Sequence, residues 1–513
     1  MKKGGNAVDA AVAVALALAV SHPAAGNIGG GGFMLIRMAD GRCVAIDYRE
    51  TAPASSTRDM FLDEKGQIVP LASMVGPHSA GVPGTVAGLA LALEKFGTMK
   101  WADVVEPARR LAVDGIVVTE ALAHSLETSP VLSRFPESRR VFLKNGKLYE
   151  RGQAFKQPDL ADTLKRLGDN GPKEFYEGET ARMIVDEMKT FGGPMSLADL
   201  KNYKAVVRDP LRGTYRGCEI ISMPPPSSGG IAILEALNIL ERFDIASKDP
   251  VTQTHLSIEA MKRAFADRAQ FLGDPDFVKI PVKGLISKRY AENAAKAISA
   301  DKASNSETVA HGVPAAYESS ETTHFSVVDS AGNAVANTYT LNGGYGSGVT
   351  VHGAGFLLNN EMDDFTSKPG SPNMFGLIQG EANAIGPGKR PLSSMSPTFV
   401  LKGGKLWFVI GSPGGPTIIN TVLEVISNVI DHEMNIRDAI EAPRFHHQWL
   451  PDVVNYEKSL RPDIVEGLRA RGHKLAAKPS AQGEAHGIMI DPISGLREGW
   501  ADKRHVDSKA AGY

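Results

Sequence analysis

One junction in the sequence has the residue types to supply both a nucleophile and its base. At Glu321-Thr322-Thr323-His324 a polar segment meets the start of an alternating strand pattern. If the chain is cut before Thr322, the new α-amine, with an intrinsic pKa of about 7.7 to 8.0, lies beside the threonine's own Oγ. The amine can then take the hydroxyl proton near neutral pH, so Thr322 could begin acyl transfer. Paired threonines also open many ordinary strands, so the junction alone leaves a structural interpretation open.

Other patterns that could carry chemistry are weaker. Gly29 to Gly32 lack the Gly-Lys-Ser/Thr ending of a phosphate loop and lead into a strand, so we expect tight backbone packing there. His446-His447 is the only adjacent histidine pair, and no carboxylate or third histidine stands at ligand spacing. Neighbours on a strand point opposite ways, so we expect a structural or surface role for the pair. The serine hydrolase pattern Gly-x-Ser-x-Gly does not occur. We expect neither a metal nor a cofactor.

The composition is that of a large globular protein. The chain has 513 residues, of which 42% are hydrophobic and 22% are charged, and this excludes a disordered or fibrous protein. Lys and Arg number 56 against 58 Asp and Glu, so no basic stripe is expected and nucleic acid is not an expected partner. Two cysteines are too few for a disulfide framework or a thiolate metal site.

The apolar run at residues 10–20 imitates part of a signal peptide. Asn6 before it can cap a helix, and Asp9 lies where the first turn favours a carboxylate. The run is also too short to span a bilayer. We therefore expect a buried helix of the mature protein.

The sequence predicts hairpins and amphipathic helices, and these elements must position the residues that could carry chemistry. Alternating runs around short turns predict hairpins, which pair 33–38 with 43–48, 324–329 with 334–340, and 398–402 with 406–410. A 3.6-residue pattern predicts helices at 83–96, 159–167, 230–243 and 252–272. Hairpins adjoining helices favour an α+β fold over a doubly wound parallel sheet. Two irregular stretches, 299–321 and 369–389, interrupt the pattern, and the second suggests a surface flap.

Twelve segments, in order, follow a single family pattern. They are GGNAVDAAVA at 4–13, GNIGGGGF at 26–33, DYRETAP at 47–53, PGTVAG at 83–88, MPPPSSGG at 223–230, GDPDFVK at 273–279, TTHFSVVD at 322–329, TYTLN at 338–342, LLNNEMDDF at 357–365, RPLSSMSPT at 390–398, GSPGG at 411–415 and APRFHHQWLPD at 442–452. In these segments the chain resembles the γ-glutamyltranspeptidases, a family of N-terminal nucleophile hydrolases. The resemblance implies an α+β fold, a four-layer αββα sandwich with antiparallel central sheets.

The resemblance also implies that the chain is a self-cleaving precursor. The cut falls between Glu321 and Thr322, which makes 1–321 a large subunit and 322–513 a small subunit within one structural domain. The stretch 299–321 would then be a mobile tether, so that Thr322 Oγ can reach the carbonyl carbon of the preceding residue.

In the mature enzyme, the resemblance assigns catalysis to four residues. Thr322 would attack the γ-glutamyl carbonyl of glutathione or a related amide, with its α-amine as base. The acyl-enzyme would pass to water or to the amine of an amino acid or dipeptide. Thr340 matches the residue that positions the nucleophile. The backbone N–H groups of Gly414 and Gly415 match the oxyanion donors.

Recognition of the γ-glutamyl group is assigned to a charged set. Arg49 matches the clamp for the substrate α-carboxylate, aided by the hydroxyls of Ser393 and Ser394. The groups around the ammonium are Asn342, Glu361 and Asp364. Singly, each has a structural interpretation, such as a surface ion pair or a turn, and it is their joint occurrence with the nucleophile motif that favours a binding site.

Two departures from the family pattern limit this assignment. In the flap, Phe375 stands where many bacterial members have a tyrosine whose hydroxyl helps to latch it, so we expect a looser gate. Members also carry a signal peptide and a further segment before GGNAVDA, which the printed sequence lacks. A periplasmic or secreted location is therefore expected from the resemblance only.

Two alternative functions remain open. Some cephalosporin or glutaryl acylases share this fold and nucleophile, but Asp364 and Arg49 favour a γ-glutamyl group, because a glutaryl group has no ammonium. The other alternative is a non-catalytic binding protein that has kept the fold, against which the intact nucleophile motif argues.

Overall fold

The computed structural model describes residues 1–312 and 324–512, and the chain divides into two compact units. The first unit consists of Met1–Arg208, Val327–Lys368 and Ala384–Pro391, and the second consists of Asp209–Ser326, Pro369–Asn383 and Leu392–Tyr513. Each unit therefore combines segments from both sides of the predicted cut before Thr322, which itself lies outside the described residues.

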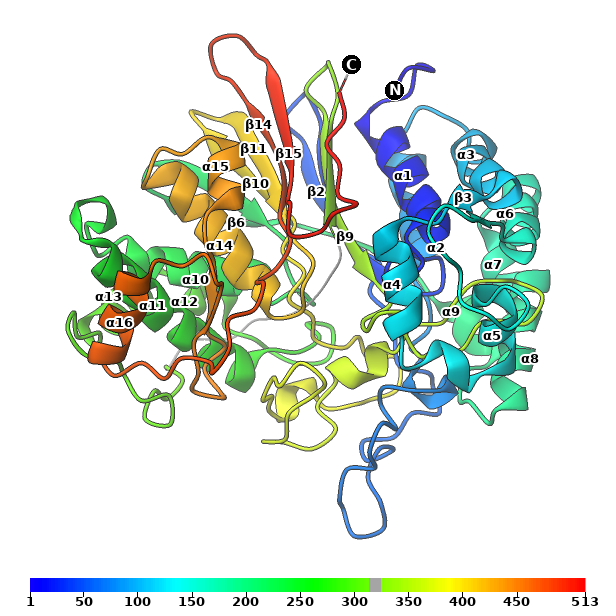
Figure 1. The fold of residues 1–513 in the computed structure, drawn as a ribbon, viewed down its shortest axis with the longest axis horizontal. Helices are drawn as coiled ribbons and strands as arrows, with labels where there is room; N and C mark the ends of the chain where they lie inside the picture. Colours follow the sequence, from blue (N-terminus) through cyan, green and yellow to red (C-terminus); the bar gives the residue numbers. More distant parts are fainter. Residues whose placement is uncertain (313–323, 513) are drawn as a thin grey trace. The chain divides into compact units, whose positions relative to one another are not determined.

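The first unit contains a five-stranded sheet in the order β5-β2-β1-β9-β8. Its strands are β1 (Gly31–Arg37), β2 (Cys43–Asp47), β5 (Val206–Arg208), β8 (His324–Val328, in which the boundary between the units falls) and β9 (Ala334–Thr340). Strands β2 and β9 of this sheet are labelled in Figure 1. Strand β1 pairs antiparallel with β2 on one side and with β9 on the other. Since β9 follows the predicted cut and β1 precedes it, backbone hydrogen bonds join the two predicted subunits inside this sheet.

The first unit also contains helices, some of which contact this sheet. They are α1 (Ala7–Ser21), α2 (Thr85–Phe96), α3 (Trp101–Asp114), α4 (Glu120–Thr128), α5 (Pro136–Phe142), α6 (Pro158–Asn170), α7 (Lys173–Glu177), α8 (Glu179–Thr190) and α9 (Leu197–Asn202), with the short strands β3 (Ile116–Val117) and β4 (Ala154–Phe155). Helix α1 contacts β9, and α2 contacts β1 and β2. Helix α2 begins two residues later than its pattern predicts, because the N–H groups of Gly84 and Thr85 donate to the Gly30 carbonyl.

Helix α1 confirms the prediction of a buried helix at the N-terminal apolar run. Asn6 accepts from the N–H groups of Val8 and Asp9, and the Asp9 carboxylate accepts in return from the Asn6 N–H at 2.7 Å. Asp9 also accepts from the backbone of Thr98 and Met99, so it ties α1 to the segment after α2. Burial opposes the charge of Asp9, but these hydrogen bonds lower its pKa.

The second unit contains a six-stranded sheet in the order β15-β14-β11-β10-β7-β6. Its strands are β6 (Leu211–Tyr215), β7 (Cys218–Ser222), β10 (Thr398–Lys402), β11 (Lys405–Gly411), β14 (His486–Ile490) and β15 (Arg497–Ala501), and each pairs antiparallel with its neighbours. Strands β7 and β10 come from opposite sides of the predicted cut, so this sheet also joins the two predicted subunits.

Helices of the second unit pack on the sheet and on one another. They are α10 (Gly229–Leu240), α11 (Pro250–Phe271), α12 (Val282–Leu285), α13 (Lys288–Lys296), α14 (Thr417–Ile430), α15 (Ile436–Glu441) and α16 (Pro462–Ala470), with a short hairpin of β12 (Phe445–His446) and β13 (Asn455–Tyr456). Helix α10 contacts β6 and β7, and α14 contacts β11. Helix α11 begins at Pro250, two residues before the predicted start, because Asp249 caps it by accepting from the N–H groups of Val251 and Thr252.

The stretch before the predicted cut differs from expectation. The predicted mobile tether began at 299, but residues 299–312 are hydrogen-bonded to side chains of the second unit. Lys262 Nζ donates to the Ser304 carbonyl at 2.6 Å, and the Trp449 indole N–H lies 2.8 Å from the Ser306 carbonyl. The polar composition of this stretch predicts a loop but does not reveal that buried charges hold its backbone. The remaining part, 313–321, lies outside the described residues.

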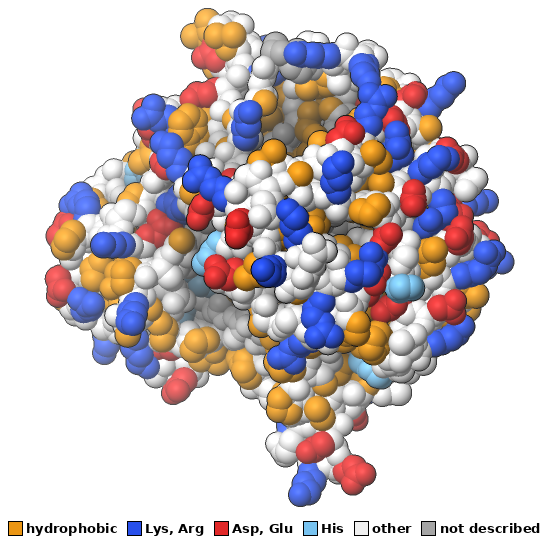
Figure 2. Space-filling model, turned by 45° about the vertical axis from the view of Figure 1, so that its right-hand side comes forward, with side chains coloured by type: hydrophobic (Ala, Val, Ile, Leu, Met, Phe, Trp, Pro, Cys, Tyr) orange, Lys and Arg blue, Asp and Glu red, His pale blue; other side chains and the backbone are white. Residues whose placement is uncertain are grey.

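Two further observations concern the surface charge and the possibility of a membrane span. On the face drawn in Figure 2, basic and acidic side chains are interspersed, in keeping with the formal net charge of −2. Among the described residues, no helix combines the length and the apolar character that a membrane span requires.

Candidate active site

The glycines that precede β1 pack against the strand end that carries Thr340. A Cβ on Gly30 would overlap the carbonyl oxygen of Thr340, and one on Gly29 would overlap that of Leu357. This confirms the prediction of tight backbone packing at Gly29 to Gly32.

Thr340 ends β9, and its side chain is held by the backbone just beyond it. The N–H of Asn342 donates to Thr340 Oγ1 at 2.8 Å, which leaves the hydroxyl proton of Thr340 for another acceptor. Asn342 has a φ of 74°, a left-handed conformation that asparagine tolerates better than most residues. Its side-chain Nδ2 donates to the Asn360 carbonyl at 3.0 Å. The predicted partner of Thr340, Thr322, lies outside the described residues.

Arg49 lies directly after β2 and forms a buried ion-pair cluster with two other predicted site residues. Its Nη1 is 2.5 Å from Glu361 Oε2, and its Nη2 is 2.5 Å from Asp364 Oδ2. Both carboxylates come from the short 3-10 helix η4 (Glu361–Asp364). Arg49 Nε donates to the Pro391 carbonyl at 3.2 Å. The structure therefore brings Arg49 together with Glu361 and Asp364, which lie more than 300 residues later in the sequence.

The charge of this cluster is unbalanced. Burial opposes the charge of Arg49, but the carboxylates of Glu361 and Asp364 raise its pKa. A further carboxyl group, Glu50, lies 3.8 Å from Arg49 Nη1 with both oxygens buried and without a hydrogen-bond partner among the described residues. Burial raises the pKa of Glu50, which favours its neutral form. One cation therefore faces two carboxylates, an excess that suits an ammonium group on a ligand.

Ser393 and Ser394 lie in the second unit with their backbones held and their hydroxyls unused. The Ser393 carbonyl accepts from the N–H of Ser228 at 3.1 Å and from its hydroxyl at 2.9 Å. The Ser394 carbonyl accepts from Ser396 Oγ at 2.7 Å. Within the described part of the chain, neither the Ser393 nor the Ser394 hydroxyl has a hydrogen-bond partner, although both are buried. Two buried, positioned hydroxyls without partners are ready to bind a polar ligand.

Gly414 and Gly415 form the turn that leads from β11 into α14. Their φ angles are 126° and 59°, conformations that favour glycine. The N–H of Thr417 donates to the Gly414 carbonyl at 3.2 Å, so the turn is continuous with the first turn of α14. The N-terminal end of this helix is its positive end, where the backbone favours negative charge. The turn is thus suited to the predicted oxyanion role, which needs two N–H donors near the reacting carbonyl.

Residues 369–383 of the predicted flap belong to the second unit, and the aromatic residue among them, Phe375, covers this turn. A Cβ on Gly415 would lie 2.9 Å from Cδ1 of Phe375, so the Phe375 ring packs directly on the glycine. Leu377 is buried in the core of the same unit. The flap is therefore anchored beside the turn and not projected into solvent.

His446 ends β12 and His447 follows it, and the two side chains have different partners. His446 contacts Asn420 of α14, at 2.7 Å between Nδ1 and Nδ2. His447 Nε2 lies 3.3 Å from Asp452 Oδ1, and Asp452 also accepts from Ser306 Oγ. Both histidines are buried, so the surface alternative is wrong.

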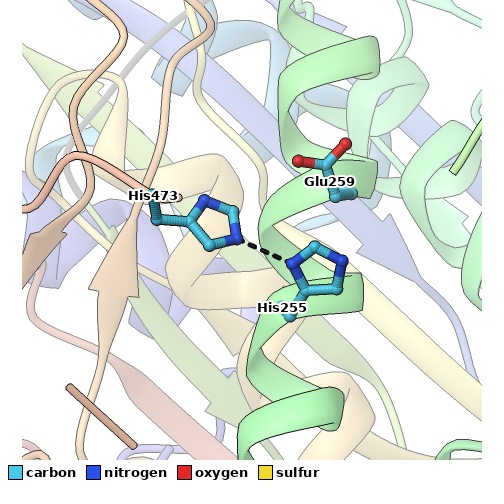
Figure 3. Close-up of side chains that lie close together, drawn as sticks. All are labelled: His255, Glu259 and His473. Atoms are coloured by element: carbon cyan, nitrogen blue, oxygen red, sulfur yellow. Dashed lines mark hydrogen bonds between the residues drawn. The ribbon is translucent and has the colours of Figure 1, made fainter. Parts of the chain in front are cut away.

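One group among the described residues has the types and spacing of a metal site: His255, Glu259 and His473 (Figure 3). His255 and Glu259 project from α11 one turn apart, and His255 Nδ1 lies 2.7 Å from His473 Nε2. Because His255 Nε2 faces the Ser299 carbonyl at 2.7 Å, that nitrogen carries the proton. His255 Nδ1 is then an acceptor, and the proton between the rings belongs to His473.

The charges around this group also fit a hydrogen-bonded network better than a metal. Glu259 accepts from Arg263 Nη1 at 2.8 Å, lies 3.2 Å from Lys262 Nζ and accepts from the N–H of Ser304. Two cations already neutralise this carboxylate, and a metal ion would be repelled by both. We assign the group to the anchoring of residues 299–304.

Several residues that support the candidate site were not predicted. Ser228 holds the backbone of Ser393, and Arg268 Nε donates to Ser228 Oγ at 3.0 Å. The signal for Ser228 was present in the motif MPPPSSGG, but Arg268 lies on a helix without a motif. Glu50 was not among the predicted site residues, and it is completely buried, with Gly31 and Gly81 packed against it.

The α+β units with antiparallel sheets, and a glycine turn before a helix, define the class of the protein. It has the fold of the N-terminal nucleophile hydrolases, and this prediction is confirmed by its similarity to a solved acylase of that fold. The crystal structure of cephalosporin acylase from Bacillus halodurans matches with a TM-score of 0.89 and 30% identity, covering 100% of this chain and 92% of that chain.

The family profile described as Gamma-glutamyltranspeptidase matches residues 1–512, and the chain belongs to that family. The glutathione hydrolase proenzyme of Escherichia coli (strain K12) is 52% identical over 517 residues, covering 100% of this chain and 89% of its own. The acylase ACY 1 proenzyme of Pseudomonas sp. (strain SE83) is 40% identical over 499 residues, covering 95% of this chain and 86% of its own. The predicted family is thus confirmed, and relatives of both predicted enzyme types exist.

Proposed function

We propose that the chain is the precursor of a γ-glutamyltransferase and glutathione hydrolase. It cleaves itself between Glu321 and Thr322 into subunits of residues 1–321 and 322–513. The mature enzyme transfers the γ-glutamyl group of glutathione and related compounds to water or to the amine of an amino acid or dipeptide.

The Arg49–Glu361–Asp364 cluster is the observation that carries this proposal. A γ-glutamyl group presents a carboxylate and an ammonium on one carbon atom, and the cluster supplies a guanidinium beside an excess of carboxylate. The buried hydroxyls of Ser393 and Ser394, without partners among the described residues, support a polar ligand as well. Asn342 supplies an amide for the same ligand.

Catalysis proceeds in two acyl-transfer steps. Thr322 Oγ attacks the γ-carbonyl carbon while its proton passes to the α-amine, and the N–H groups of Gly414 and Gly415 stabilise the oxyanion. The C–N bond then breaks, and the leaving amine takes the proton. In the second step water or an acceptor amine attacks the ester and gives its proton to the α-amine. The C–O bond then breaks, and the α-amine passes that proton to Thr322 Oγ. Thr340 donates its hydroxyl proton to orient Thr322.

The alternative, a cephalosporin or glutaryl acylase, is supported by the similarity to acylases. A glutaryl group carries no ammonium, so it would leave the excess carboxylate of the Arg49 cluster without a cation. Comparing kcat/KM for γ-glutamyl-p-nitroanilide with that for a glutaryl amide decides between the two. We expect the γ-glutamyl compound to be the better substrate, and a preference for the glutaryl amide would support the acylase.

Self-cleavage is tested on a denaturing gel. The wild type should give two bands, near the sizes of 321 and 192 residues, and Thr322→Ala should give one. A wild type that remains one chain after folding, or a variant that still splits, would contradict the proposal. We also propose a periplasmic or secreted location, supported by the family resemblance, which fractionation of expressing cells would test.

A further inference from the structure

The tip of the flap is an ordered turn that presents Phe375. Asn373 Oδ1 accepts from the N–H groups of Phe375 and Leu377, at 3.0 and 3.1 Å. The N–H of Gly376 donates to the Asn373 carbonyl at 2.9 Å. This turn leaves the Phe375 carbonyl facing away from the flap.

A chain of side chains ends on that carbonyl. Gln448 Nε2 donates to the Phe375 carbonyl at 3.2 Å, and Gln448 Oε1 lies 2.9 Å from His446 Nε2. His446 Nδ1 lies 2.7 Å from Nδ2 of Asn420, which stands in the first turn of α14. The flap tip is therefore connected, through three side chains, to the helix that begins at the Gly414–Gly415 turn.

The two ends of this chain determine the direction of every hydrogen bond. Asn420 Nδ2 also donates to the His447 carbonyl at 3.0 Å, which orients the amide so that its N–H groups face His446. His446 Nδ1 must then accept, so the ring proton is on Nε2 and is donated to Gln448 Oε1. Gln448 consequently turns its Nε2 toward the Phe375 carbonyl, where only a donor can bind.

We propose that His446 and Gln448 are positioning residues that hold the flap closed over the oxyanion turn and so set the partition between transfer and hydrolysis. The proposal rests on the function proposed above. Gln448 holds the backbone of Phe375, and the Phe375 ring in turn covers Gly415. This hydrogen-bonded tie, from His446 through Gln448 to the Phe375 carbonyl, does not need a hydroxyl on the aromatic side chain. It therefore forms although residue 375 is phenylalanine.

The physical consequence follows from the contact of Phe375 with Gly415. When the tie is broken, the ring lifts from the turn more often and water reaches the acyl-enzyme more easily. Acceptor amines gain less, because they must also bind in a defined orientation. The transfer-to-hydrolysis ratio should fall by the factor by which the open flap gains population, roughly three- to tenfold for one hydrogen bond.

Two substitutions at one position separate the tie from simple packing. Gln448→Leu removes both hydrogen bonds of the side chain. Gln448→Glu keeps an acceptor for His446 Nε2 but offers no N–H to the Phe375 carbonyl. Asn428→Ala is the matched control, because Asn428 lies on the same helix α14 and donates to the Ala439 carbonyl, away from the flap.

Three measurements are made on each purified enzyme: the ratio of transfer to hydrolysis with γ-glutamyl-p-nitroanilide and glycylglycine, the rate of the acylation burst, and hydrogen–deuterium exchange of peptides from 369–383. Both Gln448 variants should lower the ratio and speed exchange in the flap, with the burst rate unchanged. Asn428→Ala should match the wild type in all three.

The possible outcomes are distinct. If Gln448→Glu keeps the wild-type ratio and exchange, or if Asn428→Ala changes them as strongly as the Gln448 variants, the flap tie is overturned. If the wild type does not turn over the γ-glutamyl substrate, the proposed function fails instead. The exchange measurement still tests the tie in that case, because it needs no substrate.

Discussion

Replacing Gly415 by alanine tests the oxyanion turn most directly. With a φ of 59°, residue 415 lies in the left-handed region, where an alanine costs about 1–2 kcal/mol relative to glycine. Its Cβ would also lie 2.9 Å from Cδ1 of Phe375, so the ring must move. If the turn relaxes to escape this strain, the N–H of residue 415 no longer points at the oxyanion, and such a donor is worth about 3–4 kcal/mol.

The chain supplies a matched control for this substitution. Gly403, in the turn between β10 and β11, has the same φ of 59°, but a Cβ there meets nothing within 4 Å. Gly403→Ala therefore carries the conformational cost without the contact with Phe375 and without a catalytic role. Gly403→Ala should lose about 1–2 kcal/mol of stability, and Gly415→Ala should lose at least as much.

Activity separates the two variants. We expect Gly415→Ala to lower kcat on γ-glutamyl-p-nitroanilide by about 10²- to 10³-fold, and Gly403→Ala to leave kcat unchanged. The assay is steady-state hydrolysis, with thermal unfolding of both mature enzymes as the measure of stability. A Gly415→Ala enzyme with wild-type kcat, or a Gly403→Ala enzyme as impaired as Gly415→Ala, would refute the reasoning.

Three further changes have defined outcomes. Burial lowers the pKa of His446 to about 4 from 6.5, so neutral His446 contributes about 3 kcal/mol of stability that is fully present above pH 6.5 and is lost as the pH falls toward 4. The thermal midpoint of the wild type should therefore fall between pH 7 and pH 4.5, and that of His446→Asn should fall less. An equal fall in both proteins would contradict this. In Arg49→Lys, a single ammonium replaces the two Nη groups that pair with Glu361 and Asp364, so kcat/KM for the γ-glutamyl donor should drop by about 10- to 100-fold. A wild-type value would exclude Arg49 as the clamp for the substrate carboxylate. Phe375→Tyr should raise the transfer-to-hydrolysis ratio by adding a latching hydroxyl, and an unchanged ratio would count against that role of the flap.

Local patterns in the sequence predicted part of the fold. The capped helix at Ala7–Ser21, the hairpin of β1 with β2 and the hairpin of β10 with β11 all have the predicted positions. These elements depend on capping residues, alternation and turns, which act over a few residues. Two helices begin at other residues than predicted. The start of α2 depends on the carbonyl of Gly30, which is distant in the sequence, and the start of α11 depends on the cap formed by Asp249 before Pro250.

The candidate site was predicted from motifs, but its charge state was not. The sequence indicated that Arg49, Glu361 and Asp364 belong to one binding site, because their motifs occur together. It did not indicate that Glu50 joins them as a buried neighbour, or that the hydroxyls of Ser393 and Ser394 lack partners within the described residues. Burial and partner geometry depend on side chains contributed by distant segments, so no local pattern reports them.

By itself, the sequence determined the family and predicted several elements and the residues proposed to bear the chemistry, because these depend on residue identity and short-range spacing. Only the tertiary structure decided how those residues are held. It bound 299–312 through buried Lys262 and partly buried Trp449, where the family resemblance implied a mobile tether. It also joined Asn420, His446 and Gln448 to the Phe375 carbonyl. Such contacts link residues far apart in the chain through backbone carbonyls, which carry no sequence signal, so only the fold could place them.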